Sequence, residues 1–278
     1  MKALPLVFTD LDGSLLDHGN YSYRDALPQL RRLARLNVPV VPVSSKTRAE
    51  IACLRDELSL DGAFIVENGA AVCIPVGFFQ VPPPDVIERD GFWVREWCQP
   101  RQHWLQLLAD LRHEFAGEFE NFERAGTRGI VAMTGLDKAQ AEAANAREYS
   151  EPVQWLGSPG RKQAFVERLL QSGAEVLQGG RFLGVSGSCD KGRALVWLRE
   201  LFQRAHPERV IHDLAVGDSE NDVAMLEAAE TALVVRSPVH DFPSLQRTQG
   251  VMYSTGFGPA GWAEGVARWL ACLPPAEE

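Results

Sequence analysis

The stretch Phe8-Thr9-Asp10-Leu11-Asp12-Gly13-Ser14 closes an apolar run that begins at Leu4. The run predicts a buried strand over Leu4–Thr9, with two aspartates at its carboxyl end. Because strand side chains alternate between faces, Asp10 and Asp12 point the same way, into the crevice where open α/β sheets bind ligands. Like charges this close repel each other unless a cation bridges them or one carboxyl keeps its proton. The pair therefore predicts a functional site.

The sequence after this strand alternates between helical and strand-like patterns. An amphipathic helix is predicted within Ser22–Leu36, and a short apolar strand follows at Val38–Val43. Thr47 and Glu50 have the spacing of a capping box, which predicts the start of another helix. Ala63–Val66 is the third apolar run. This alternation predicts an α/β fold with a doubly wound parallel sheet.

A different lobe interrupts the pattern. The segment Val81-Pro82-Pro83-Pro84 predicts a stiff linker, and 278 residues are long for one compact core. We therefore predict a core domain in residues 1–83 and 188–278, with an α+β cap domain in residues 84–187. Helical patterns in this cap cover Arg101–Phe115, Asp137–Arg147 and a segment opened by Ser158-Pro159, and strand-like pieces cover Ile130–Met133 and Glu175–Leu177.

The alternating pattern resumes at Asp190, which begins a predicted helix. The apolar strand Val210–Val216 ends in Gly217-Asp218-Ser219-Glu220-Asn221-Asp222, where Ser219 and Asp222 have capping-box spacing. A last strand is predicted at Ala232–Val235 and a closing helix at Pro259–Leu273. The two outer parts of the chain therefore build one domain around the inserted cap.

Composition narrows the possible partners. A net charge of −9 without a long Lys or Arg cluster argues against a nucleic-acid partner. No apolar run is long enough to span a bilayer, and the N-terminus does not have the layout of a signal peptide. The five cysteines lack metal-ligand spacing and favour reduced thiols in the cytoplasm. The sequence leaves the oligomeric state open.

Four polar clusters follow predicted strands or open predicted helices. They are Asp10/Asp12, Ser44-Ser45-Lys46, Lys191 and Asp218/Asn221/Asp222. In a doubly wound sheet such clusters meet at one edge. Three or four carboxylates with one lysine suit a hard divalent cation, and oxygen ligands favour Mg²⁺.

These clusters resemble the haloacid dehalogenase superfamily of phosphatases. The signature of that superfamily is D-x-D-G-[ST], a Ser or Thr after the second strand, a Lys opening a helix, and G-D-x-x-N-D. The chain carries these motifs in that order as Asp10–Ser14, Ser44, Lys191 and Gly217–Asp222. An insertion between the second and third motifs is similar to the Cof-like branch. The resemblance implies a Rossmann-like core with an inserted cap.

The resemblance and the chemistry together imply roles for the residues of the motifs. Asp10 would be the nucleophile that forms an aspartyl-phosphate, and Asp12 the general acid and then the base. Ser44 and Lys191 would hold the phosphoryl oxygens.

The implied metal ligands come from two motifs that are far apart in the sequence. Asp218 would bind Mg²⁺ with Asp10 and the backbone carbonyl of Asp12, and Asp222 would support the metal shell. Asn221 would hydrogen-bond the phosphate or Lys191.

Three further motifs are similar to mannosyl-3-phosphoglycerate phosphatases. Ser44-Ser45-Lys46-Thr47 resembles their S-K-T stretch, Arg147–Pro152 their R-x-[YF]-S-E-P motif, and Gly179–Phe182 their G-G-R-[FY] turn. The resemblance implies a small phosphorylated sugar-glycerate substrate, whose carboxylate needs a positively charged side chain from the cap domain. The predicted substrate-binding residues are Ser45, Lys46, Asn68, Arg147, Ser150, Glu151, Arg181 and Asn221.

Other functions stay open beside this one. The substrate could be another sugar phosphate or glucosyl-3-phosphoglycerate, and a sensor that binds a phosphorylated ligand without turnover is the non-enzymatic alternative.

Single motifs also have structural alternatives. Lys191 suits a plain helix start after a capping Asp190, and Asp222 suits a capping box alone. Asn68 suits a turn, and Arg147 with Glu151 suits a surface ion pair.

Overall fold

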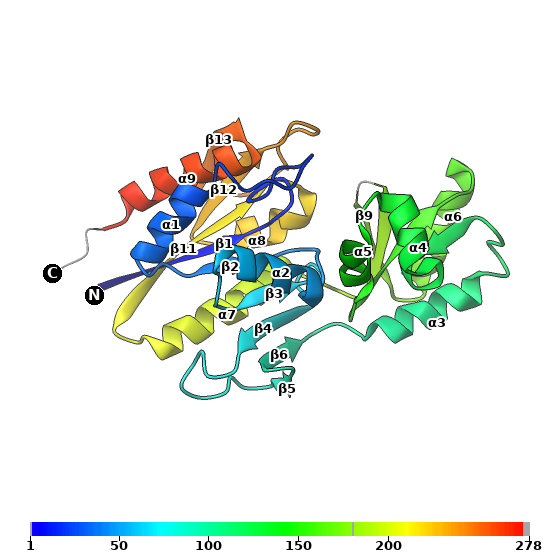
Figure 1. Cartoon of the computed structure of the whole chain (residues 1–278), viewed down its shortest axis with the longest axis horizontal. Coiled ribbons are helices and arrows are strands. Elements are labelled where there is room, and N and C mark those ends of the chain that lie inside the picture. The colour runs from blue at the N-terminus through cyan, green and yellow to red at the C-terminus, as the bar shows by residue number, and fades with distance from the viewer. Residues whose placement is uncertain (1, 180, 275–278) are drawn as a thin grey trace. The chain divides into compact units, whose positions relative to one another are not determined.

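The chain packs into two compact units (Figure 1). The computed structural model describes residues 2–179 and 181–274. The first unit comprises Met1–Ser44, Ser59–Arg95 and Asp190–Glu278, and the second comprises Ser45–Leu58 and Glu96–Cys189. The domain boundaries at 83/84 and 187/188 stay predictions.

A five-stranded parallel sheet forms the centre of the first unit. Its strand order is β13-β12-β11-β1-β2, and every pairing is parallel. The strands are β1 (Lys2–Thr9), β2 (Val40–Pro42), β11 (Arg209–Gly217), β12 (Thr231–Arg236) and β13 (Val251–Phe257). Leu6, Val7 and Phe8 are fully buried, as expected for a strand covered on both faces. The predicted α/β fold around a parallel sheet is confirmed.

Helices cover both faces of this sheet. The helices are α1 (Leu27–Arg35), α7 (Lys191–Ala205), α8 (Val223–Ala228) and α9 (Gly258–Cys272). In Figure 1, α1 and α9 lie together on one side of the sheet and α7 on the other. Helix α9 buries Trp262, Val266 and Trp269, the inward face that its apolar spacing predicts.

A second, four-stranded sheet belongs mainly to the first unit. Its order is β3-β4-β6-β5, with β3 (Phe64–Val66), β4 (Ala71–Pro75), β5 (Ile87–Arg89) and β6 (Phe92–Glu96). The pairings of β3 with β4 and of β5 with β6 are antiparallel. A parallel bridge between Val43 and Ile65 joins the end of the β2 segment to β3. Only β3 was expected from the sequence; β4 precedes the proline-rich segment Val81–Pro84, and β5 and β6 follow it.

The second unit is an α+β arrangement with its own antiparallel sheet, in the order β7-β8-β10-β9. Its strands are β7 (Phe119–Asn121), β8 (Ser150–Trp155), β9 (Glu175–Gly179) and β10 (Phe182–Ser186). Its helices are α2 (Arg48–Leu58), α3 (Arg101–Leu111), α4 (Phe122–Thr134), α5 (Lys138–Asn145) and α6 (Pro159–Gln171). Trp104, Phe115 and Phe165 are fully or almost fully buried in its core, and this packing holds the sheet against α3 and α6.

One predicted element of this unit is wrong. Ile130–Met133 was expected to be a strand, but it lies in helix α4. Its four apolar residues fit a short strand and a helical turn equally well. The helix forms here because Ile130 packs into a cluster with Phe122, Ala141 and Ala144.

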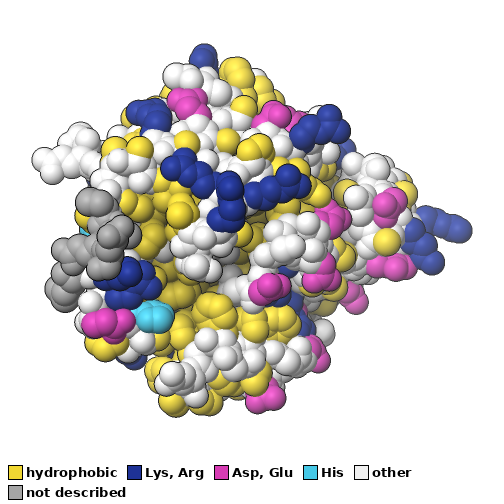
Figure 2. All heavy atoms as spheres, turned by 60° about the vertical axis from the view of Figure 1, so that its left-hand side comes forward, with side chains coloured by type: hydrophobic (Ala, Val, Ile, Leu, Met, Phe, Trp, Pro, Cys, Tyr) yellow, Lys and Arg dark blue, Asp and Glu magenta, His cyan; other side chains and the backbone are white. Residues whose placement is uncertain are grey.

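Charge is unevenly spread over the surface despite the negative net charge. Figure 2 looks onto the side where the chain ends lie in Figure 1, and a row of Lys and Arg side chains crosses it beside apolar surface. Within residues 2–179 and 181–274, no helix has the length and apolar character needed to cross a bilayer.

Candidate active site

The site is built where β1 and β11 end side by side. Thr9 is paired with Val216, and the Asp10 backbone N–H donates to the Val216 carbonyl at 2.8 Å. This register brings Asp10, which follows β1, next to Asp218, which follows β11. Both side chains are buried. The predicted meeting of strand-end carboxylates at one sheet edge is therefore observed within this unit.

Lys191 joins two of the carboxylates. Its Nζ lies 2.8 Å from Asp10 Oδ1 and 2.7 Å from Asp222 Oδ1. All three side chains are buried, so these are charge-assisted hydrogen bonds in a low-dielectric setting. Burial disfavours the ammonium form, but the two carboxylates outweigh it and hold the pKa of Lys191 above its ordinary value. The charged form of Lys191 is therefore favoured, and its burial against two carboxylates contradicts the alternative of a plain helix start with the lysine side chain in solvent.

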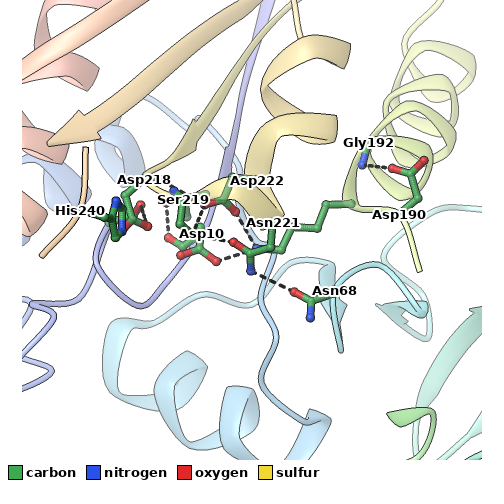
Figure 3. Close-up of polar contacts among 12 residues, drawn as sticks. Asp10, Asn68, Asp190, Gly192, Asp218, Ser219, Asn221, Asp222 and His240 are labelled. Carbon is green, nitrogen blue, oxygen red and sulfur yellow. Dashed lines mark hydrogen bonds and ion pairs between the residues drawn. The ribbon is translucent and has the colours of Figure 1, made fainter. Parts of the chain in front are cut away.

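The segment before Lys191 is anchored by a helix cap. The Asp190 carboxylate accepts from the Gly192 and Arg193 backbone N–H groups at 2.8 and 3.0 Å, as predicted for the start of this helix (Figure 3). Gly69, at φ +89°, lies against the Asp190 carbonyl so closely that a Cβ there would overlap with it. These contacts fix the position from which Lys191 extends toward Asp10.

Asp10, Asp218 and Asp222 form a cluster of buried carboxylates. One oxygen from each lies within 4.8 Å of the others. Burial, and then the charge of Asp222, raise the pKa of Asp10 well above its ordinary value. The same two causes raise the pKa of Asp218 to about 6. One ammonium does not neutralise three carboxylates, and an all-oxygen donor set fits a hard divalent cation such as Mg²⁺.

Asp222 has two partners at once. Its Oδ1 accepts from Lys191, and its Oδ2 accepts from the Asp218 and Ser219 backbone N–H groups, each at 3.1 Å (Figure 3). The capping box of the short 3₁₀ helix η1 (Glu220–Asp222) is present as predicted. Asp222 therefore both caps the turn and belongs to the charged cluster.

The surroundings of Asp218 include a residue that the sequence did not suggest. His240 Nε2 lies 3.3 Å from Asp218 Oδ2, and Ser14 donates to Oδ1 at 3.4 Å (Figure 3). Gly13 has φ +85°, and a Cβ there would come within 2.5 Å of Asp218 Oδ2, so only glycine leaves room for the carboxylate. No spacing motif connects His240 with Asp218, because the loop after β12 alone brings them together.

Asn68 and Asn221 lie on another side of the cluster. The Asn221 amide donates to Asn68 Oδ1 at 3.2 Å, and the Ser219 hydroxyl donates to Asn221 Oδ1 at 2.6 Å (Figure 3). Asn68 has φ +61°, as predicted for the turn, and its backbone N–H donates to the Ser44 carbonyl at 2.9 Å. This turn therefore links Ser44, which is fully buried, to the Asp218 segment.

Asp12 has a different setting from Asp10. It is half-buried in the loop that follows β1, paired through a bridge with Leu16. Among the described residues the three-carboxylate cluster has Asp10, Asp218 and Asp222 as members, so the Asp12 side chain is not part of it. A carboxyl outside the cluster suits a proton-transfer role better than a metal-binding one.

The remaining predicted site residues lie in the second unit. The Arg147 guanidinium donates to the Ser45 carbonyl at 3.2 Å and to the Ser150 hydroxyl at 2.9 Å. Lys46 Nζ lies 4.0 Å from Glu50. Arg147 therefore gathers the S-K-T stretch and the R-x-[YF]-S-E-P motif into one place.

Glu151 is not in the surface ion pair with Arg147 that was one alternative. It is fully buried and accepts from Arg101 Nε at 2.6 Å, and from the Asn121 side chain and the Glu123 backbone N–H, each at 2.8 Å. The sequence missed Arg101 as its partner, because 50 residues separate the two.

Arg181 lies at the end of helix α4. It donates to the Met133 and Thr134 carbonyls at 3.0 and 3.1 Å. Gly180, which precedes it in the G-G-R-[FY] turn, lies outside the described residues.

A shallow, open hollow on helix α1 is separate from the site. Its lining is Pro28, Arg31, Ala34 and Arg35, and it includes none of the predicted site residues.

Known proteins resemble this chain over nearly its whole length. No family model matches it. A glucosyl-3-phosphoglycerate/mannosyl-3-phosphoglycerate phosphatase of Methanococcoides burtonii is 34% identical over 262 residues, which are 94% of this chain and 95% of that protein. A protein of the same name from Persephonella marina is 31% identical over 275 residues, covering 95% and 97%.

Solved structures resemble it in fold. A haloacid dehalogenase-like hydrolase from B. subtilis has a TM-score of 0.60 at 18% identity, covering 99% of this chain and all of that one. A sucrose-phosphatase from Synechocystis has a TM-score of 0.57 at 15% identity, covering 97% and 98%. With the two sequence relatives, these likenesses show that the chain belongs to the glucosyl-3-phosphoglycerate/mannosyl-3-phosphoglycerate phosphatase family and has the fold of haloacid dehalogenase-like hydrolases.

Proposed function

We propose that this chain is a magnesium-dependent phosphomonoester hydrolase that works through an aspartyl-phosphate at Asp10. Its proposed substrate is mannosyl-3-phosphoglycerate, which it would convert to mannosylglycerate and phosphate. The observation that carries the proposal is the buried contact of Asp10 with Lys191, at 2.8 Å, beside two further carboxylates. The names of the two sequence relatives support the substrate class.

The first step uses Asp10 as the nucleophile. One carboxylate oxygen of Asp10 attacks phosphorus, and the bond between phosphorus and the substrate oxygen breaks. Asp12, outside the charged cluster, gives its proton to the departing alkoxide. Lys191 assists twice, because its charge favours the ionised form of Asp10 and offsets the charge on the phosphoryl oxygens.

The second step reverses the role of Asp12. Now ionised, Asp12 takes a proton from a water molecule whose oxygen attacks phosphorus. The bond between phosphorus and Asp10 breaks, so phosphate leaves and Asp10 is regenerated. Ser44 and Asn221 are the proposed hydrogen-bond donors to the phosphoryl oxygens in both steps.

Asp10, Asp218 and Asp222 are the residues that would hold or support Mg²⁺. The cation supplies positive charge that offsets the carboxylates and the transferring phosphoryl group. The pKa values of Asp10 and Asp218, raised first by burial and then by the charge of Asp222, support this assignment, because a bound cation would favour their ionised forms. Asp12 contributes only its backbone carbonyl in this proposal.

Phosphate release tests the reaction. Wild-type protein and Asp10→Asn would be assayed with Mg²⁺ and with a chelator, using mannosyl-3-phosphoglycerate, glucosyl-3-phosphoglycerate, other sugar phosphates and a small aryl phosphate. We expect Mg²⁺-dependent release that is fastest with mannosyl-3-phosphoglycerate and is lost in Asp10→Asn. No release from any phosphomonoester by folded, metal-loaded protein would contradict the enzyme and favour the ligand sensor.

The glucosyl substrate is the second candidate. The double name of both relatives favours testing it on equal terms. Faster release from the glucosyl compound would replace the proposed sugar and leave the reaction intact.

A further inference from the structure

Two cysteines that are far apart in the sequence meet in the second unit. Cys98 Sγ and Cys189 Sγ lie 2.7 Å apart, although 91 residues separate them. Both side chains are partly exposed. Nothing in their spacing predicts this contact, because neither forms a CxxC pair.

The backbone of residues 187–189 lies close to Cys98. A Cβ on Gly187 would lie 3.9 Å from Cys98 Cβ and 3.2 Å from the ring of Trp104, which is buried in the core of the unit. The Cys189 N–H donates to the Gly187 carbonyl at 2.7 Å, forming a tight turn. The backbone of the 187–189 turn therefore lies close to both Cys98 and the ring of Trp104.

We propose that Cys98 and Cys189 are a reversible oxidation site, which a peroxide converts into a disulfide. One thiol loses its proton, and the thiolate attacks an oxygen of hydrogen peroxide; the O–O bond breaks, the sulfenic acid forms, and the released hydroxide takes up that proton and leaves as water. The other thiol then attacks the sulfenic sulfur, so that the S–S bond forms, the S–O bond breaks and a second water leaves. The two sulfurs give up two electrons in total, and the peroxide is reduced to two waters.

The proposed Cys98–Cys189 disulfide would form two residues before Lys191 in the chain. Cys189 directly precedes Asp190, whose carboxylate caps helix α7, and Lys191 is the first residue of that helix. Bonding shortens the gap between the sulfurs from 2.7 Å to about 2.0 Å and so moves the turn that leads into α7. Asp190 lies between Cys189 and Lys191, and its carbonyl is in close contact with Gly69. Because Asp190 has little free space on that side, we expect a shift of Cys189 to change the position of Lys191. We therefore expect oxidation to slow phosphate release, a consequence that rests on the proposed function.

The experiment follows the bond and the activity separately. Full-length protein would be treated with hydrogen peroxide, and one part then reduced with dithiothreitol. Peptide mass spectrometry without reductant is expected to find a peptide joining Cys98 and Cys189 that lacks two hydrogen atoms. Phosphate release is expected to fall several-fold on oxidation and to recover on reduction. The mass measurement does not depend on the proposed function.

Matched variants separate this pair from the other thiols. Cys98→Ser and Cys189→Ser are each expected to keep the basal rate of phosphate release and to lose its sensitivity to peroxide. The double variant Cys53→Ser/Cys272→Ser removes two exposed cysteines and is expected to respond like wild type. Absence of the joined peptide, or bonding of other cysteines alone, would overturn the site. A joined peptide with unchanged phosphate release would overturn the expected effect on Lys191.

Discussion

Each unit contains a buried charged cluster, and the two clusters differ in balance. In the first unit, Lys191 is the one ammonium among the carboxylates Asp10, Asp218 and Asp222. In the second unit, the Glu151 carboxylate has the Arg101 guanidinium, the Asn121 amide and a backbone N–H as donors. Both clusters are buried, so burial alone does not separate them.

The two clusters differ in how well their negative charges are matched by positive charges and hydrogen-bond donors. Around Glu151 the donors match the acceptors, as in a network that specifies a fold. Around Asp10 the negative charge exceeds the positive charge, and burial together with the charge of Asp222 raises the pKa values of Asp10 and Asp218. An unbalanced cluster costs folding free energy, and a ligand of opposite charge relieves it. Imbalance, rather than burial, marks the candidate active site.

The largest expected effect comes from breaking the unbalanced cluster at Asp10, the proposed nucleophile. Asp10→Asn keeps the size of the side chain but removes both the attacking oxygen charge and one of the repelling carboxylates. We expect phosphate release to fall by at least about 1000-fold while the melting temperature stays near that of wild type. Steady-state kinetics and thermal unfolding measure the two quantities.

Asp213 offers a matched control. It is a buried aspartate of β11 that pairs with Arg199 at 3.0 Å, outside the cluster. Asp213→Asn is expected to lower stability and to keep kcat. A wild-type rate in Asp10→Asn would rule out the covalent step.

The second prediction breaks the balanced cluster. Glu151→Gln leaves the Arg101 guanidinium without its buried charge partner, so we expect a loss of about 3 kcal/mol in the free energy of unfolding. Denaturant unfolding measures this loss. Glu123→Gln is the control, because Glu123 also pairs with Arg101, at 3.1 Å, but is half-exposed, and its removal should cost far less. Equal losses in the two variants would contradict the structural role of Glu151.

The third prediction concerns the pH dependence of Mg²⁺ binding at the carboxylate cluster. The pKa of Asp218 is about 6 in the fold against an ordinary value of 3.8. Between these values the folded, metal-free protein keeps a proton that the unfolded chain releases, so this carboxyl costs stability as pH rises toward 6. Mg²⁺ must displace that proton below pH 6 but not above it. We expect the Mg²⁺-induced stabilisation to weaken below pH 6 by about 1.4 kcal/mol per pH unit for each displaced proton.

Thermal unfolding with and without Mg²⁺, about one unit above and one unit below pH 6, measures this difference. Asp218→Asn should lose most of the stabilisation and its pH dependence. A Mg²⁺ effect that is the same at both pH values would argue against this cluster as the metal site.

The smallest expected effect concerns Arg181, an exposed arginine of the second unit. Arg181 donates to two carbonyls at the end of α4, so Arg181→Ala should lower the melting temperature only slightly. If Arg181 also holds the glycerate carboxylate, KM for mannosyl-3-phosphoglycerate should rise roughly tenfold. KM for a small aryl phosphate should stay unchanged.

Arg161→Ala is the control, because this exposed arginine of the same unit pairs with Glu118 and has no predicted substrate role. Equal changes for both substrates, or the same change in Arg161→Ala, would make Arg181 a structural residue.

The sequence predicts the first unit better than the second. Continuous apolar runs that end in polar clusters identified β1 and β11, and capping signals identified the starts of η1 and α7. In the second unit, short apolar segments such as Ile130–Met133 fit a strand or a helix equally well, and packing against Phe122 decided for the helix. Domain boundaries and the roles of individual site residues stay predictions.

The α/β fold class, the order of the motifs and the types of side chain at the sheet edge can all be predicted from the amino-acid sequence. This is possible because these signals are local, resting on side-chain periodicity and on residues close together in the chain. The contacts between individual side chains are visible only once the chain is folded. They join Lys191 to Asp10 and Asp222, His240 to Asp218, Arg101 to Glu151, and Cys98 to Cys189. Each joins residues far apart in sequence, and which donor meets which acceptor depends on how strands and helices pack in three dimensions.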